Sequence, residues 1–134
     1  MKNIKPSKTK KNIFKDLMIL GSATEDVVVE GFTFQISTLS EKENAELLTG
    51  LMALDEQNRV ILSKAHSVAM SVKKINDQNF DEIIDLIEEI PDDLNNIFAK
   101  KIFFISSLQT NIVNKLFEKY VEINSKLEEE DKKK

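Results

Sequence analysis

Apolar and polar residues alternate in two short runs between residues 25 and 37, and the runs meet at Glu30-Gly31. A two-residue turn at this pair needs positive φ angles, which glycine adopts without strain. Because the side chains of a strand point alternately to its two faces, the pattern predicts a β-hairpin with one apolar face. The expected register pairs Val29 with Phe32, Val27 with Phe34 and Glu25 with Ile36, and it collects Val27, Val29, Phe32, Phe34 and Ile36 on that face.

Beyond the hairpin, apolar residues recur at intervals of three and four, which is typical of amphipathic helices. Ser40 and Glu43 have the spacing of a capping box, so a helix is expected over about 41–54. The next stretch predicts a second helix over about 56–74, which an aspartate just before it can cap. A single bent helix over 41–74 is the alternative, because the polar break between the two is weak.

Two further helices are expected. The first runs over about 82–90 and stops at Pro91, whose ring cannot extend the preceding turn. The second runs over about 93–128 and carries an apolar seam of bundle or coiled-coil type. A second apolar set widens this seam beyond what the other elements can cover, which indicates a partner. The hypothetical partner-binding residues are Phe98, Ile102, Ile105, Leu108, Ile112, Leu116 and Tyr120.

The expected fold class is therefore α+β, mainly α, with one N-terminal β-hairpin packed on a helical bundle that has a long C-terminal helix. A single domain is expected over 13–128, in which residues 13–20 form a short amphipathic helix or a docked segment. We expect a basic disordered arm over 1–12 and a charged tail over 129–134. The hairpin alone is marginal in water, so the helices must cover its apolar face.

Composition agrees with a globular protein, because 41% of the 134 residues are hydrophobic and 31% are charged. The absence of cysteine excludes disulfides and thiolate metal sites and suits a reducing compartment. No apolar run approaches the roughly 18–20 residues of a membrane span. A cytoplasmic protein without a membrane partner is therefore expected.

Charge is distributed unevenly along the chain. Residues 1–15 contain six lysines and no acid, whereas residues 81–93 contain seven acids and no base. A basic arm can contact nucleic acid, but such contacts usually also use arginine and exposed aromatic rings. The chain has one arginine, Arg59, and no aromatic residue among its first thirteen. Nucleic acid is thus disfavoured as a partner, and the arm is interpreted as a solvated terminus.

The residues offer little for catalysis. His66 is the only histidine, nothing at helical spacing gives it a metal-binding companion, and we interpret it as a helix residue near the edge of the apolar stripe. Carboxylates one turn apart at 81 and 85, and at 88 and 92, can in principle clamp a hard cation, but we interpret them as the solvated face of one short helix. The expectation is no enzyme, no cofactor and no metal.

Three segments resemble a known family. They are the hairpin around Gly31-Phe32-Thr33-Phe34, which passes through Thr-Leu-Ser into an acid-rich helix; the helix ending in SVKKIN; and the stretch Asn114–Tyr120. Together they resemble the small tail assembly chaperones of long-tailed bacteriophages and the related baseplate-assembly proteins of contractile tails. The resemblance implies a non-enzymatic protein of the host cytoplasm that binds aggregation-prone tail components, typically the tape measure or hub proteins.

Several alternatives remain at this point. The same apolar faces can close the chain's own core or a homo-oligomer. A structural component of the virion, in the tail or baseplate, is the second functional reading. A helical adaptor or antitoxin-like binding protein is the third.

Overall fold

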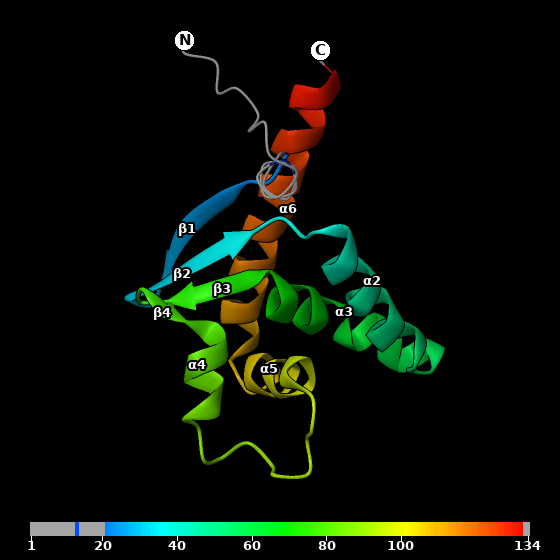
Figure 1. Ribbon diagram of the computed structural model, residues 1–134, viewed down its shortest axis with the longest axis vertical. Helices are drawn as coiled ribbons and strands as arrows, with labels where there is room; N and C mark the ends of the chain where they lie inside the picture. Colours follow the sequence, from blue (N-terminus) through cyan, green and yellow to red (C-terminus); the bar gives the residue numbers. More distant parts are fainter. Residues whose placement is uncertain (1–12, 14–20, 133–134) are drawn as a thin grey trace.

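Figure 1 shows the computed structural model of the protein, which describes residue 13 and residues 21–132. The expected arm at 1–12, nearly all of the expected segment at 13–20 and residues 133–134 lie outside the described residues. The described chain is mainly helical, and a sheet of four antiparallel strands, two near its beginning and two after the first helices, packs against the helices. The predicted class, α+β and mainly α, is confirmed.

Strands β1 (Thr24–Val29) and β2 (Phe32–Ser37) form the hairpin in the predicted register, with Val27 opposite Phe34. The turn between them has φ angles of 52° at Glu30 and 82° at Gly31. Two positive φ angles match the right-handed twist of the flanking strands. The sequence pattern was therefore sufficient to predict this element.

Two strands were not predicted. Helix α3 (Glu56–Ser71) ends at Ser71 instead of continuing to residue 74, and β3 (Val72–Ile75) follows at once. β3 pairs antiparallel with β2 and with the short β4 (Gln78–Asn79), so the sheet order is β1-β2-β3-β4. The free edge of the hairpin supplies backbone partners for these residues, and that tertiary pairing outweighs their helical spacing.

Helix α2 (Glu41–Met52) and α3 are separate, so the chain does not adopt the alternative of one bent helix. The capping box of Ser40 and Glu43 is present, and Asp55 caps α3 by accepting a hydrogen bond from the backbone of Asn58. The single arginine holds the corner between the two helices. Its guanidinium donates to the carbonyl oxygens of Leu51 at 3.1 Å and Leu54 at 3.0 Å.

The predicted boundaries of the last two helices are wrong. Helix α4 (Phe80–Asp85) is shorter than expected, and the residues from 86 to 96 form turns and irregular structure. Asn96 caps α5 (Ile97–Ser106), and a break at 107–109 separates α5 from α6 (Thr110–Lys132). One straight helix would leave much of its wide apolar surface in water, whereas the break lets α6 fold back against the sheet. The helical path also continues past residue 128.

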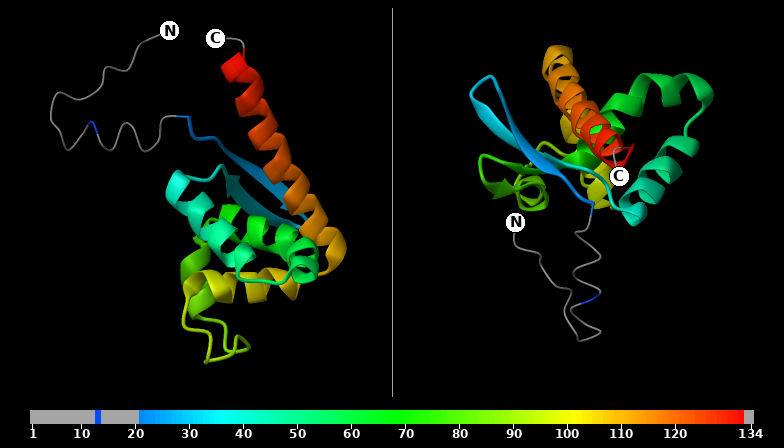
Figure 2. Two further views of the ribbon diagram at one scale, coloured as in Figure 1. Left: turned by 90° about the vertical axis from the view of Figure 1, so that its right-hand side faces the viewer. Right: turned by 90° about the horizontal axis from the view of Figure 1, so that it is seen from above.

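Helix α6 passes behind the sheet in Figure 1 and lies beside its strands in Figure 2, in contact with β1 and β2. Helices α3 and α5 pack on each other, and α3 also packs on α6. Most of the apolar face of the hairpin is therefore covered by the chain itself. The buried core joins all these elements, with Ile36, Val68, Val72, Phe80, Ile105, Leu116 and Ile123 among its most enclosed side chains.

Candidate functional site

The seven expected partner-binding residues do not form one continuous seam, because they are divided between α5 and α6. Phe98, Ile105 and Leu116 are buried in the chain's own core, so this chain already occupies their apolar surface. The other four, Ile102, Leu108, Ile112 and Tyr120, are half-buried. Only this second group retains surface that a partner can reach.

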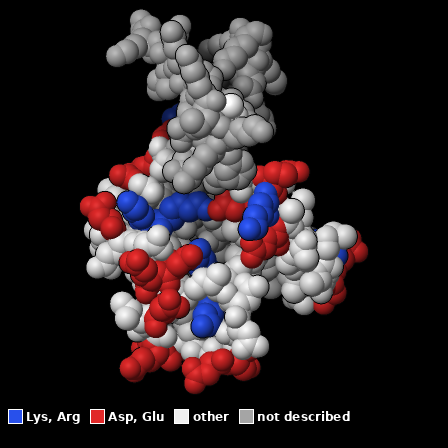
Figure 3. Space-filling view, in the orientation of Figure 1, with Lys and Arg blue, Asp and Glu red and all other residues white. Residues whose placement is uncertain are grey.

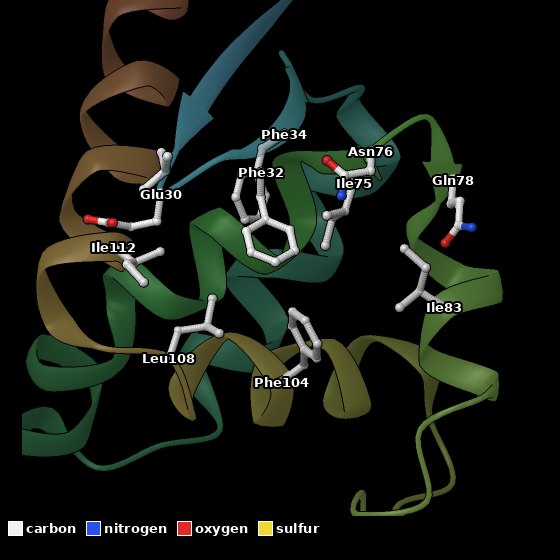
Figure 4. A pocket seen from close by; sticks show the side chains of 11 residues that line it. Glu30, Phe32, Phe34, Ile75, Asn76, Gln78, Ile83, Phe104, Leu108 and Ile112 are labelled. Carbon is white, nitrogen blue, oxygen red and sulfur yellow. The ribbon is translucent and has the colours of Figure 1, made fainter.

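Leu108 and Ile112 line an open cavity of about 370 Å³ at the tip of the hairpin, shown in Figure 4. We call it the tip groove. The rings of Phe32 and Phe34 extend from β2 toward Leu108 and Phe104 on the opposite side. The groove is lined by Val29, Glu30, Phe32, Phe34, Ile75, Asn76, Gln78, Ile83, Phe104, Leu108 and Ile112.

The tip groove exists because the cover over the hairpin is incomplete. Phe34 is only 6% exposed, but Phe32, on the same face and nearer the turn, is 52% exposed. The corner between α5 and α6 forms the opposite wall, and α4 closes one side with Ile83. An aromatic ring that is half in water on the rim of an apolar hollow is the type of surface that binding sites use.

The walls of the groove are held in place by packing behind them. The ring of Phe104 lies edge-on against the buried ring of Phe80, with 5.3 Å between centroids. At the opposite rim, Asn76 ties the turn after β3 to β2: its backbone N–H donates to the carbonyl oxygen of Thr33 at 2.8 Å, and its Oδ1 accepts from the N–H of Thr33 at 2.9 Å. The hollow is therefore preformed.

Sequence reasoning found part of this site. It placed Phe32 and Phe34 on one face of the hairpin and included Leu108 and Ile112 among the partner-binding residues. It missed Ile75, Ile83 and Phe104, because their positions depend on β3, on the end of α4 and on the break at 107–109. The available signal was the Asn76-Asp77 pair, whose residue types tolerate the positive φ angles of a tight turn, because Val72–Ile75 (VKKI) does not alternate.

Acidic side chains lie beside the groove. Figure 3 shows Asp and Glu gathered around α4 and the segment after it, where residues 81–93 carry seven acids. One of them, Asp81, forms an ion pair with Lys101 of α5. Glu30 is the only charged residue among those that line the groove. The α4 side of the groove and its Glu30 rim are thus acidic.

Ion pairs attach α6 to the first strand. Lys119 lies 2.8 Å from Glu25 of β1 and 2.8 Å from Glu122, and Lys126 lies 3.4 Å from Glu25. The hydrogen bond from Lys119 lowers the pKa of the Glu25 carboxyl, and the same lysine lowers the pKa of Glu122. Hydrogen bonds to Glu122 and Glu25 raise the pKa of Lys119 in turn. These charges hold α6 against the sheet edge and leave the groove itself apolar.

His66 was expected near the edge of the apolar stripe of its helix, and the structure shows its side chain buried. Its Nδ1 lies 2.8 Å from the carbonyl oxygen of Leu62, which can only accept, so Nδ1 carries the proton. The ring meets Phe98 edge-on, with 5.9 Å between centroids. This histidine therefore joins α3 to α5 by packing on Phe98, and its hydrogen bond stays within α3.

Within the part of the chain that the structure describes, no group of three or more His, Cys, Asp or Glu side chains is arranged to hold a metal ion. Partial burial raises the pKa of the Tyr120 hydroxyl. None of the helices in the described ranges combines the length and apolar character that crossing a membrane requires.

Comparisons of the chain with protein-family models, with curated proteins and with solved structures give no match.

Proposed function

We propose that this protein is a non-enzymatic tail assembly chaperone of a bacteriophage, which binds a tape measure or hub protein in the host cytoplasm. The observation that carries the proposal is the tip groove, an open apolar hollow with the half-exposed ring of Phe32 on its rim. The resemblance of the hairpin and the following helices to that family supplies the biological setting.

The physical requirements of such a chaperone agree with these features. A protein that keeps an aggregation-prone partner in solution needs an apolar surface to bind it and a charged body that repels further copies. The chain carries a net charge of −4, and the lining of the apolar hollow contains one acid, Glu30, and reaches the acid-rich helix α4 through Ile83. We place partner binding at this groove, because Phe98, Ile105 and Leu116 are already buried.

Co-expression with the candidate partner tests the proposal. Any tape measure or hub gene encoded near this one is expressed with and without it, and the soluble yield and co-purification of each product are measured. We expect the protein to raise the soluble yield of one of them and to co-purify with it. If neither product is affected, the proposed function is wrong.

Two further measurements separate the alternatives. Recovery of the protein in stoichiometric amounts from purified particles would identify a structural virion component instead of a transient chaperone. Binding to a toxin encoded beside it, with no effect on tail proteins, would identify an antitoxin-like protein. Sedimentation of the isolated protein reports whether a homo-oligomer forms before any partner binds.

A further inference from the structure

We propose that the tip groove receives a short segment of another protein that presents one or two large apolar side chains beside a lysine or arginine. This inference rests on the proposed function, because it names the chemistry of the partner segment that the groove recognises.

Size limits what can enter. The volume of about 370 Å³ is near the lower end of the roughly 300–1,000 Å³ that ligand pockets occupy. A whole helix, about 10–12 Å across with its side chains, does not fit in such a hollow. The groove therefore takes individual side chains of a segment that lies across its mouth.

The walls select apolar side chains. Phe32, Phe34 and Phe104 present aromatic rings, and Ile83, Leu108 and Ile112 present methyl groups. Asn76 lies on the rim, and its Oδ1 already accepts a hydrogen bond from the backbone of Thr33. A polar side chain that entered the groove would lose its hydrogen bonds to water and find few replacements among these walls. Large apolar anchors are thus favoured.

The acids beside the groove determine which charge is favoured next to the apolar anchor. Glu30 is the charged group in the lining, and on the opposite side Ile83 belongs to α4, where the acids of residues 81–93 begin. Lys101 is paired with Asp81, which offsets only one of these acids. At 0.1 M salt, screening confines their effect to about 10 Å. A cation directly beside the apolar anchor is therefore favoured, and an acid there is disfavoured.

The same charges argue against other occupants. A second copy that inserted its own exposed Phe32 would bring its Glu30 toward the Glu30 and the α4 acids of the first copy. An anionic lipid surface or a nucleic acid would meet the same repulsion. A basic and apolar segment of another protein is the occupant that the surroundings favour.

The test uses three synthetic helix-forming peptides of equal length and the full chain. One carries an apolar face flanked by lysines, one carries the same face flanked by glutamates, and one carries the lysines with serine in place of the apolar residues. Binding is followed at low salt through the methyl signals of Ile75, Ile83, Leu108 and Ile112. We expect the first peptide to shift these methyls and to bind roughly fivefold more tightly than the second, the size expected of a few exposed ion pairs. The third should not bind.

Matched variants connect the binding to the groove. Phe32→Ser should strongly weaken binding of the first peptide. Val28 is comparably exposed on the opposite face of the same hairpin, so Val28→Ser should leave the affinity for this peptide unchanged. Glu30→Gln should reduce the difference in affinity between the lysine and glutamate peptides. Thermal unfolding of each variant checks that the fold is retained, and at 52–66% exposure neither residue should be needed for it.

Three results would overturn the inference: equal affinity for the lysine and glutamate peptides, shifts confined to methyls outside the groove, or equal losses for the two serine variants. Its failure is distinguishable from failure of the proposed function. If a tail protein co-purifies equally with the wild type and with Phe32→Ser, the function stands and the groove is not its site. If the peptides bind as expected but no tail protein is affected, the groove stands and the function is wrong.

Discussion

Three apolar residues of the hairpin show how position decides the role of a side chain. Val28 is 66% exposed, Phe32 is 52% exposed and Phe34 is 6% exposed, although all three belong to strands of the same sheet. Alternation alone predicted that Val28 points away from the core. It could not separate Phe32 from Phe34, because the pattern identifies a face but not the point at which the covering helices end.

At this scale we expect Phe34→Ala to lower the free energy of unfolding by about 3–5 kcal/mol, since it empties a large buried site. Val28→Ala should change it by less than about 0.5 kcal/mol, because that side chain is mostly in water. Urea denaturation of the two variants provides the comparison. Equal losses would mean that the assignment of the two hairpin faces is wrong.

Glu43 gives a prediction that depends on pH. Partial burial by itself would raise the pKa of Glu43, but hydrogen bonds from Lys73 and the backbone of Ser40 outweigh it and hold the pKa below its ordinary value of 4.5. Because the folded-state pKa is the lower one, the resulting stabilisation is complete above about pH 4.5 and is lost as the pH falls through the folded-state value.

The variants Glu43→Gln and Glu43→Ala separate the two roles of this side chain. Glutamine can still accept the hydrogen bond from the Ser40 N–H but cannot pair with Lys73, so it should cost less than about 1 kcal/mol at neutral pH. Alanine loses both contacts and should cost more. Stability measured against pH should show the glutamine variant converging with the wild type as the pH falls through the folded-state pKa of Glu43. A constant gap down to low pH would contradict the charge argument.

Helix α2 contains a glycine whose small size the fold does not need. A Cβ atom at Gly50 would lie 3.4 Å from Cε2 of Phe98 and 3.6 Å from Cδ2 of His66, which is ordinary van der Waals contact. Gly50→Ala should therefore stabilise the protein by up to about 1 kcal/mol, the usual helix preference for alanine. Gly31→Ala, at a φ of 82°, should instead destabilise it by about 1–2 kcal/mol. Thermal melting of both checks the contrast.

The corner between α2 and α3 depends on one side chain. Arg59→Met keeps the apolar stem but removes both hydrogen bonds to the carbonyl oxygens of Leu51 and Leu54, so we expect a loss of about 1–2 kcal/mol. Arg59→Lys should recover part of it, because an ammonium can reach only one carbonyl well. If methionine costs nothing, the corner is held by packing alone.

Elements differed in how far the sequence could predict them. The caps of α2 and α3 and the hairpin turn depend on neighbours in the chain, and each was predicted. Strand β3 and the break at 107–109 depend on residues far along the chain, and each was missed. Residues 72–75 and 107–109 each continue the apolar spacing of the helix before them, so their local sequence is compatible with helix. Pairing with the sheet edge ends the first helix, and packing on the core ends the second.

For the whole molecule, the docking of α6 is the main long-range feature. Ile123 is 1% exposed on this helix, whereas Val121, two residues earlier, is 45% exposed. Ile123→Ala should cost about 2–5 kcal/mol and Val121→Ala should cost little, as chemical denaturation can show. Similar small effects for both would mean that α6 does not pack on the rest of the chain. The tip groove depends on the same docking, which explains why residues alone predicted only part of it.

The covering of the hairpin by α6 has a consequence for biosynthesis. The ribosome releases the hairpin early, but its apolar face is covered by a helix that begins only at Thr110. At roughly 5–20 residues per second, that face stays uncovered for on the order of ten seconds in each nascent chain. During that interval Val27 and Phe34 are open to the same aggregation that, by our proposal, the finished protein prevents in others.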